Sequence, residues 1–284
     1  MAGRRTFDVD YRSASIELVP RNLCSGWPEA PIRLTLSDHT PLALMVGTAA
    51  LYWFVLVPHV FPALRPQTAS VKAHWTRMRS TWNCFLFLFS ACCCGTAVAS
   101  LWQDGQLFRS GAWEALHCRP VEGTRLRAVS TLFTFSKLWE WGDTLFLIAL
   151  GHKPPEFLRL YHHATTFWLF GFVMNMPGPE KFGLLLNGGV HTLMYAHYWR
   201  PWPKPLVPLI TLAQIGQLGF VTYSWTISPR LCGPAGAAFA AAPSELPLAF
   251  VTPYAMVPVY LYFFLVFFAK RFLGVGAKRK HKEQ

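Results

Sequence analysis

Seven long apolar stretches constrain the structure of this chain more than any other feature. Apolar residues make up 52% of the 284 residues and charged residues only 14%, compared with about 25% charged residues in soluble domains. The stretches lie near residues 41–63, 82–102, 127–150, 157–176, 182–199, 205–227 and 247–272. About 20 apolar residues suffice to cross a bilayer as a helix, which satisfies its own backbone hydrogen bonds in lipid. We therefore expect an all-α, polytopic membrane protein with seven transmembrane helices.

The distribution of charge divides the chain into three segments and orients it. Residues 1–38 are polar, residues 39–273 hold the apolar stretches, and residues 274–284 form a basic tail. Lys and Arg favour the cytosolic side of a membrane, and their distribution here predicts a cytosolic C-terminus. The net charge is +12, but the chain has no basic helix with interleaved aromatic residues. This pattern argues against nucleic-acid binding.

Residues outside the apolar stretches give two expectations about the cellular setting. Lys280 and Lys282, near the end of the tail, resemble the di-lysine retrieval signal of endoplasmic reticulum membrane proteins. An ordinary basic flank that stops translocation explains them as well. Cys118 and Cys232 fall in two loops that this topology places in the oxidising lumen, where disulfides form. We therefore predict a bridge between these two cysteines.

Ionisable side chains are concentrated in the third to sixth apolar stretches. Because a charge is costly inside a bilayer, each of them is a functional hypothesis. Lys137, Glu140 and Thr144 share one helical face at spacings of three and four residues, and we expect Lys137 and Glu140 to neutralise each other. Asp143 is turned away from that face by about a third of a turn. The alternative is a purely structural ion pair that locks the helices together.

Two neighbouring stretches supply three histidines. Arg159 and His162 share a helical face, and His163 points about 100° away from His162. Further polar residues follow at helical spacing on the fifth and sixth stretches, and they are Asn187, His191, Tyr195, Gln214 and Gln217. A lone histidine inside a membrane is often a packing residue. Three histidines on adjacent stretches, accompanied by amide and hydroxyl groups, indicate a site instead.

Three chemistries are compatible with these residues. A metal centre would use His and carboxylate ligands, but Arg159 stands where a His-x-x-His-His box needs its first ligand, and Arg cannot coordinate a metal. Covalent catalysis would use a neutral imidazole that attacks a thioester. A second histidine would then move protons, and Asn187 or Tyr195 would stabilise an oxyanion. A receptor or transporter would use the same groups to bind a ligand or carry protons.

Four motifs follow one another between residues 137 and 217. They are Lys137-x-x-Glu140-x-x-Asp143-Thr144, Tyr161-His162-His163, Asn187-x-x-x-His191-x-x-Met194-Tyr195 and Thr211-x-x-Gln214-x-x-Gln217. In this order they resemble the motifs of the ELO family of very-long-chain fatty acid elongases. One such motif would be weak, whereas four in order are specific. The pattern of seven apolar stretches extends the resemblance over most of the chain.

The resemblance implies an enzyme of the endoplasmic reticulum membrane whose seven helices enclose an acyl tunnel. The family condenses a long-chain acyl-CoA with malonyl-CoA, releases CO2 and CoA, and forms a 3-ketoacyl-CoA two carbons longer. By motif position, His162 carries the acyl group as an acyl-imidazole, and His191 works on the facing side of the site. The step needs no metal or redox cofactor. Reductase and dehydratase partners complete the cycle, and assembly into a homo-oligomer is left open.

The other motif residues are candidates for catalysis or substrate binding. The further catalytic candidates are His163, Asn187 and Tyr195. The substrate-binding candidates are Lys137, Glu140, Asp143, Arg159, Tyr161, Gln214, Gln217 and Lys204, of which Lys204 would meet CoA on the cytosolic side. Arg159 departs from the histidine of the family, and because Arg cannot accept a proton, we expect it to orient its neighbours. The alternative function is a lipid-binding or lipid-transporting membrane protein without condensing activity.

Overall fold

The computed structural model is almost entirely helical. It describes residues 15–17, 33–35, 40–118, 124–152, 155–173, 179–231 and 248–275. A short antiparallel pair of strands, β1 (Ser15–Glu17) and β2 (Arg33–Thr35), precedes the helices. The α-helices are α1 (Thr40–Ala50), α2 (Phe61–Ala63), α3 (Ala69–Gln103), α4 (Ala112–Cys118), α5 (Thr124–Trp139), α6 (Trp141–Ala149), α7 (Phe157–Val173), α8 (Pro179–Phe182), α9 (Gly188–Trp199), α10 (Val207–Leu231) and α12 (Leu248–Phe272). Two π-helices, η1 (Leu51–Val60) and η2 (Gly183–Asn187), and a 3-10 helix, η3 (Lys204–Leu206), complete them. The expected helical architecture is thus confirmed, and the small sheet is an addition to it.

Both terminal segments lie mostly outside the described residues. Of the polar segment 1–38 only the two strands are described, and of the basic tail 274–284 only residues 274 and 275. Lys280, Lys282 and Cys232 also lie outside the described residues. The retrieval signal and the cytosolic C-terminus therefore stay predictions.

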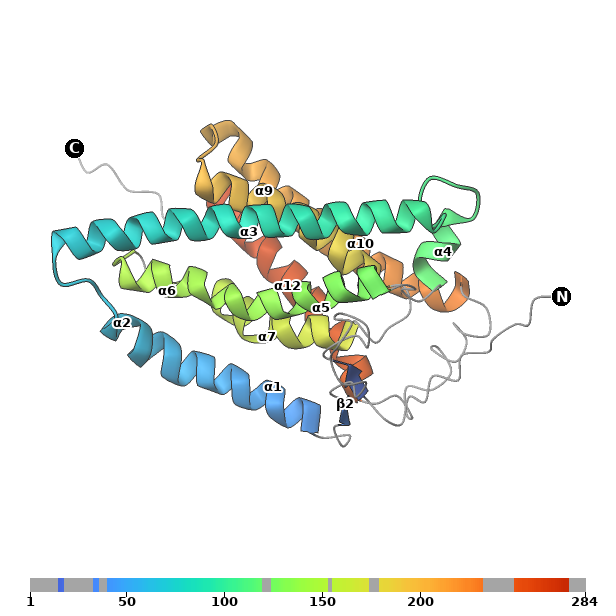
Figure 1. Ribbon diagram of the computed structural model, residues 1–284, viewed down its shortest axis with the longest axis horizontal. Helices are drawn as coiled ribbons and strands as arrows, with labels where there is room; N and C mark the ends of the chain where they lie inside the picture. Colours follow the sequence, from blue (N-terminus) through green and yellow to red (C-terminus); the bar gives the residue numbers. More distant parts are fainter. Residues whose placement is uncertain are drawn as a thin grey trace.

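Helix α3 is the longest element and runs along most of the molecule in Figure 1. The side chain of Thr68 caps its N-terminus by accepting a hydrogen bond from the backbone N–H of Val71 at 3.3 Å, which satisfies one of the free donors of the first turn. Helix α3 packs along α9 and against α5 and α6, while α7 packs against α5, α12 and α1. These contacts bring the helices that carry the polar motifs into one bundle.

Within the part of the chain that the structure describes, four helical segments are long and apolar enough to cross a membrane. They are Ala43–Ala63, Ala69–Gln103, Lys204–Ile227 and Tyr254–Phe272. They correspond to the first, second, sixth and seventh predicted stretches. The third stretch is divided at Glu140 into α5, of 16 residues, and α6, of 9 residues. The fourth forms α7, of 17 residues, and the fifth forms η2 and α9, of 5 and 12 residues. None of these is among the four segments, so the count of seven spans stays a prediction.

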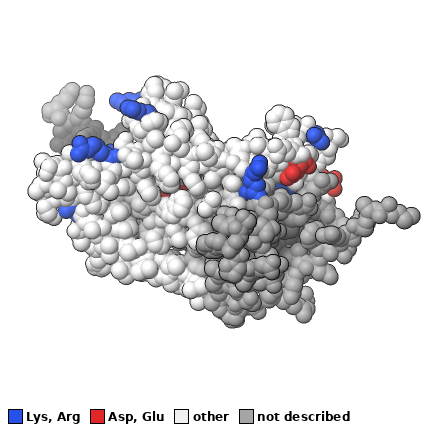
Figure 2. All heavy atoms as spheres, in the orientation of Figure 1, with Lys and Arg blue, Asp and Glu red and all other residues white. Residues whose placement is uncertain are grey.

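Charged side chains are sparse on the face shown in Figure 2, where they gather toward the two ends of the long axis. The white area between them shows almost no charged atoms, as expected for a surface in contact with lipid. Helix α3 has 35 residues and is therefore about 52 Å long at a rise of 1.5 Å per residue. The hydrocarbon core of a bilayer is only about 30 Å thick. The first turns of α3, which carry Lys72, Arg77 and Arg79, therefore have to extend into the headgroup layer.

The contact between α3 and α9 depends on a glycine. A Cβ atom on Gly188 would lie 3.2 Å from the Cβ atom of Cys94, which is tighter than ordinary contact. A Cβ atom on the adjacent Gly189 would lie 3.9 Å from the Cys94 sulfur, an ordinary contact distance. Small residues allow helices in a membrane to approach closely. Gly188 therefore sets the distance between α3 and the motif-bearing helix α9.

We predict that Gly188→Ala makes the protein less stable than Gly189→Ala does. The first substitution overpacks the contact between α3 and α9, which costs about 1–3 kcal/mol. The second adds an ordinary contact and removes a glycine from a helix, which favours the folded state. Thermal unfolding of both variants in detergent should give the lower melting temperature for Gly188→Ala. Equal melting temperatures would show that this contact does not limit helix packing.

Candidate functional site

A buried ion pair lies at the centre of the polar motifs. The Lys137 ammonium donates to Glu140 Oε1 at 2.7 Å and to Asn187 Oδ1 at 2.9 Å. Lys137 is 1% exposed and Glu140 is 3% exposed, so neither charge is solvated by water. The faces of Phe133 and Phe170 lie 4.1 Å and 4.8 Å from the ammonium and add a cation–π attraction. The sequence-based expectation that Lys137 and Glu140 neutralise each other is thus met by their geometry.

The backbone between α5 and α6 places Glu140 and Asp143 on different sides. Glu140 itself keeps helical backbone angles (φ −61°, ψ −14°) and donates its N–H to the Ser136 carbonyl at 3.0 Å. Its own carbonyl accepts from the N–H of Asp143, three residues later, at 3.0 Å. A bond over three residues tightens the helix locally. The Glu140 side chain consequently meets Lys137 of α5 and His191 of α9, whereas Asp143 meets Trp82 of α3 and Tyr195 of α9.

Two histidines from facing helices meet at the Glu140 carboxylate. His162 comes from α7 and His191 from α9, and one ligand-type atom from each of them and from Glu140 lie within 4.8 Å of one another. His191 Nδ1 is 3.2 Å from Glu140 Oε1, so His191 is held beside the carboxylate. The Nδ1 atom of His162 is buried without a hydrogen-bond partner among the described residues. An imidazole nitrogen of this kind is available to a substrate.

Asp143 and Thr144 bind partners from the first, second and fifth apolar stretches. The Tyr195 hydroxyl donates to Asp143 Oδ2 at 2.7 Å, and the Trp82 indole N–H donates to Asp143 Oδ1 at 3.1 Å. The Tyr52 hydroxyl donates to Thr144 Oγ1 at 2.8 Å. Sequence analysis missed Trp82 and Tyr52, because each stands among other aromatic and apolar residues of its stretch. Their only signal was a polar atom at membrane depth, which has to find a partner.

Arg159 and His162 have different surroundings on α7. Arg159 interacts electrostatically with Asp143 and Tyr198, so its charge lies on the Asp143 side of the cluster. The His162 ring meets the ring of Tyr260 from α12 with centroids 5.2 Å apart, and the Tyr260 hydroxyl shares a 2.6 Å hydrogen bond with Thr165. Tyr260 is 1% exposed and is a further residue that sequence analysis missed. Its ring packs edge-to-face against the His162 ring.

The other predicted residues lie on or near the border of the cluster. Gln214 of α10 contacts the Met194 sulfur of α9 at 3.7 Å, which joins the third and fourth motifs. Gln217 Oε1 is buried without a hydrogen-bond partner among the described residues. Tyr161 stacks on Phe157, with centroids 5.9 Å apart and planes at 7°. Lys204 is exposed in η3, at the start of α10.

The cluster also contains residue types that could hold a metal ion. Glu140, His162 and His191 have the ligand types and proximity to hold a metal ion, although the Lys137 ammonium already binds the Glu140 carboxylate.

The predicted disulfide is tested at one of its two cysteines. Cys118 is disulfide-bonded. Its pairing with Cys232 stays a prediction, because Cys232 lies outside the described residues.

Comparison with known proteins places the motifs in a wider context. The family described as ELO: GNS1/SUR4 family matches residues 36–283. The chain is 28% identical to very long chain fatty acid elongase 7 of Rattus norvegicus over 193 residues, which are 66% of each chain. It is 36% identical to very long chain fatty acid elongase 5 of Mus musculus over 49% of this chain and 50% of the relative. It is 34% identical to very long chain fatty acid elongase 3 of Homo sapiens over 37% of this chain and 43% of the relative. The chain thus spans between about two fifths and two thirds of the length of these relatives.

We predict that Lys137→Met destabilises the protein more than the double substitution Lys137→Met/Glu140→Gln. The single change leaves a buried carboxylate without its cation, which costs about 3–5 kcal/mol, whereas removing both charges is far less costly. Unfolding of the purified variants in detergent should show this order. Lys72→Met, at an exposed position on α3, is the matched control and should keep the original stability. A double variant as unstable as the single one would show that the lost charge pairing is not the cause.

Proposed function

This chain belongs to the ELO family, and we propose on that premise that it is a membrane-bound condensing enzyme. The proposed reaction joins a long-chain acyl-CoA to malonyl-CoA and yields a 3-ketoacyl-CoA two carbons longer, with release of CO2 and CoA. The names of the relatives, all very long chain fatty acid elongases, support this substrate class. The observation that carries the proposal is the meeting of His162 and His191 at a buried, charged cluster.

The proposed mechanism has two half-reactions. In the first, an imidazole nitrogen of His162 attacks the thioester carbonyl, the C–S bond breaks, and CoA leaves as a thiol after taking up the imidazole proton. In the second, malonyl-CoA loses CO2, and the electron pair of the broken C–C bond forms an enolate. The enolate carbon attacks the acyl-imidazole, the C–N bond breaks, and the departing imidazole takes up a proton from solvent, relayed by a neighbouring histidine, so that neutral His162 is regenerated. Splitting a difficult transfer into two easier steps is the usual advantage of covalent catalysis.

The neighbouring residues have complementary roles in this proposal. His191 and His163 move protons or polarise the thioester carbonyl. Asn187 supplies N–H donors that stabilise the enolate away from water. The Tyr195 hydroxyl, which donates to Asp143 in the structure, would turn toward the enolate to add a second donor. The Lys137–Glu140 pair positions Asn187 and His191, because Lys137 binds the Asn187 amide oxygen and Glu140 lies against His191. No metal or redox cofactor takes part in these steps.

Arg159 is proposed to orient the site rather than to act as a base. An arginine remains protonated and cannot accept a proton. Its charge lies near Asp143 and Tyr198, and Asp143 in turn accepts the hydrogen bond of Tyr195. Arg159 therefore holds the Asp143 side of the cluster and leaves the transfer of protons to the histidines.

The setting of the reaction is part of the same proposal. Seven helices would enclose a tunnel for the acyl chain, in the endoplasmic reticulum membrane, with the C-terminus in the cytosol. Exposed Lys204 would help to bind the phosphates of CoA at the cytosolic entrance, and Tyr161, Gln214 and Gln217 would line the path of the substrate. Reductase and dehydratase partners would convert the product further, and a homo-oligomer is compatible with the scheme.

The purified protein should form 3-ketoacyl-CoA when it is given malonyl-CoA and a graded series of acyl-CoAs, with products followed by mass and no reductant added. His162→Asn should lower turnover at least about a hundredfold, the lower end of what a positioned imidazole contributes. His197→Asn is the matched control, because Asn can replace His197 Nδ1 as the acceptor for the Trp202 N–H. No product from folded protein at any chain length would refute the proposal and favour lipid binding or transport.

A further inference from the structure

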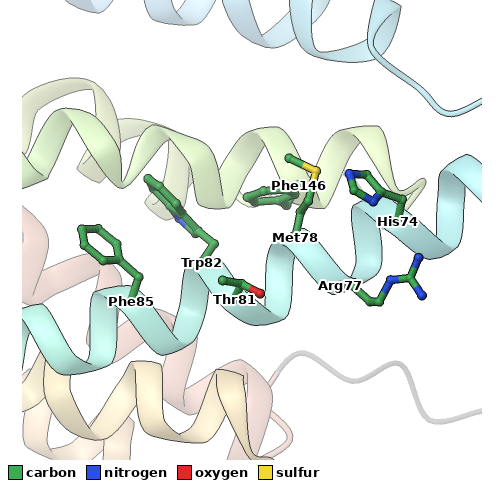
Figure 3. Close-up of a pocket in the computed structure, with 7 residues that line it drawn as sticks. All are labelled: His74, Arg77, Met78, Thr81, Trp82, Phe85 and Phe146. Atoms are coloured by element: carbon green, nitrogen blue, oxygen red, sulfur yellow. The ribbon is translucent and has the colours of Figure 1, made fainter.

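An open groove lies between α3 and α6, on the side of α3 that faces away from α9 (Figure 3). Its volume is about 640 Å³, which is within the range of about 300–1,000 Å³ found for small-molecule sites. Met78 and Phe85 of α3 are 42% and 44% exposed, so the groove is accessible from the surroundings of the protein. Its lining includes His74, Arg77, Met78, Trp82, Phe85 and Phe146.

The residues that line the groove are basic at one end and aromatic at the other. Figure 3 shows His74 and Arg77 at one end, and Trp82 and Phe85 toward the other. The lining contains no Asp or Glu, so its only permanent charge is the exposed Arg77 guanidinium. The groove therefore combines a cationic end with an apolar floor, which is the complement of an amphiphile with an anionic head.

Among the described residues the Arg77 guanidinium has no hydrogen bond or ion pair, in contrast to that of Arg79. Arg79 Nη1 lies 2.7 Å from His152 Nε2, so Arg79 donates to a neutral imidazole. Partial burial, together with the charges of Arg79 and Lys72, lowers the pKa of His152 and keeps it in this accepting form. The Arg79–His152 hydrogen bond also joins the segment that follows α6 to α3. Arg77 lies two residues earlier on the helix, on the side that lines the groove.

The length of α3 places the groove at the boundary of the bilayer. From Phe85 to the end of the helix at Gln103 there are 18 further residues, or about 27 Å of helix. This length nearly fills the hydrocarbon core of about 30 Å. The segment from His74 to Thr81 consequently lies at the level of the headgroups, and Trp82 and Phe85 begin the hydrocarbon. The cationic end of the groove thus lies at the depth of lipid phosphates, and the aromatic end at the depth of acyl chains.

We propose that this groove binds an anionic glycerophospholipid from the bilayer. Its phosphate would lie against Arg77 and His74, and one acyl chain would cover Met78, Phe85 and Phe146. A lipid is favoured over a soluble ligand because the groove opens at the membrane boundary and matches both the charge and the apolar part of such a molecule.

The proposed lipid would share a wall with the polar cluster. Trp82 lines the groove on one side and donates to Asp143 on the other. The Trp82 ring lies close to the backbone of Gly142, where a Cβ atom would come within 3.1 Å of it. One side chain therefore separates the bound lipid from the Asp143–Tyr195 contact.

Native mass spectrometry of the full chain in detergent tests the proposal, with dioleoyl phosphatidylserine and dioleoyl phosphatidylcholine as probes. We expect phosphatidylserine to bind more tightly, and Arg77→Gln to weaken its binding at least about tenfold through loss of a charge-assisted hydrogen bond. Lys72→Gln removes the same charge from the same helix outside the groove lining. This control should stay within about twofold of the original affinity, because an exposed charge is screened by water and salt.

A second variant tests the shape of the site independently of its charge. Thr81 lines the groove at its midpoint and is exposed, so Thr81→Trp should fill the groove and reduce phosphatidylserine binding with Arg77 intact. Equal binding of the two lipids would overturn the proposal. Equal losses in Arg77→Gln and Lys72→Gln, or full binding by Thr81→Trp, would show a general attraction of the basic surface instead of a site. Melting temperatures near that of the original protein confirm that the variants are folded.

Discussion

A charge buried at membrane depth needs a partner, and the contact of Lys137 with Glu140 meets that need for the whole polar cluster. Without the ammonium, a carboxylate with 3% exposure would face only imidazole and aromatic rings, at a cost of several kcal/mol. Lys137 also binds Asn187, and Glu140 lies beside His191. The pair thus connects α5, η2 and α9 at one point. The position of His191 relative to His162, on which the proposed chemistry depends, follows from this connection.

Helix α3 borders two environments, the buried polar cluster and an exposed groove. On one side it packs on α9 through Gly188 and contributes Trp82 to the Asp143 carboxylate. On the other side it presents an exposed groove with a basic end. Its length, about 52 Å, exceeds the hydrocarbon core, so the same helix serves the buried cluster and the headgroup layer. A single long helix therefore relates the chemistry of the proposed reaction to the lipid surroundings of the protein.

Sequence and structure agree where the signal is local. The ion pair follows from residues three positions apart in sequence. The four helical segments that are long and apolar enough to cross a membrane, among the described residues, follow from composition. Partners that are distant in sequence were not predictable: the bonds of Tyr52 to Thr144 and of Trp82 to Asp143 join helices whose mutual orientation is set by packing. The same is true of Tyr260 beside His162. The division of the third stretch at Glu140 was also missed, because hydropathy does not report a hydrogen bond that tightens one turn.

The central claim is that a histidine carries the acyl group, and mapping that group on the protein tests it most directly. The full chain would be incubated with a long-chain acyl-CoA in the absence of malonyl-CoA, quenched rapidly, digested, and examined by mass spectrometry. The account predicts an acyl mass on the peptide that contains His162, which disappears when malonyl-CoA is added before the quench. Formation of product with the acyl group on the adjacent cysteines of α3, Cys92 to Cys94, or with no acylated peptide during turnover, would contradict it.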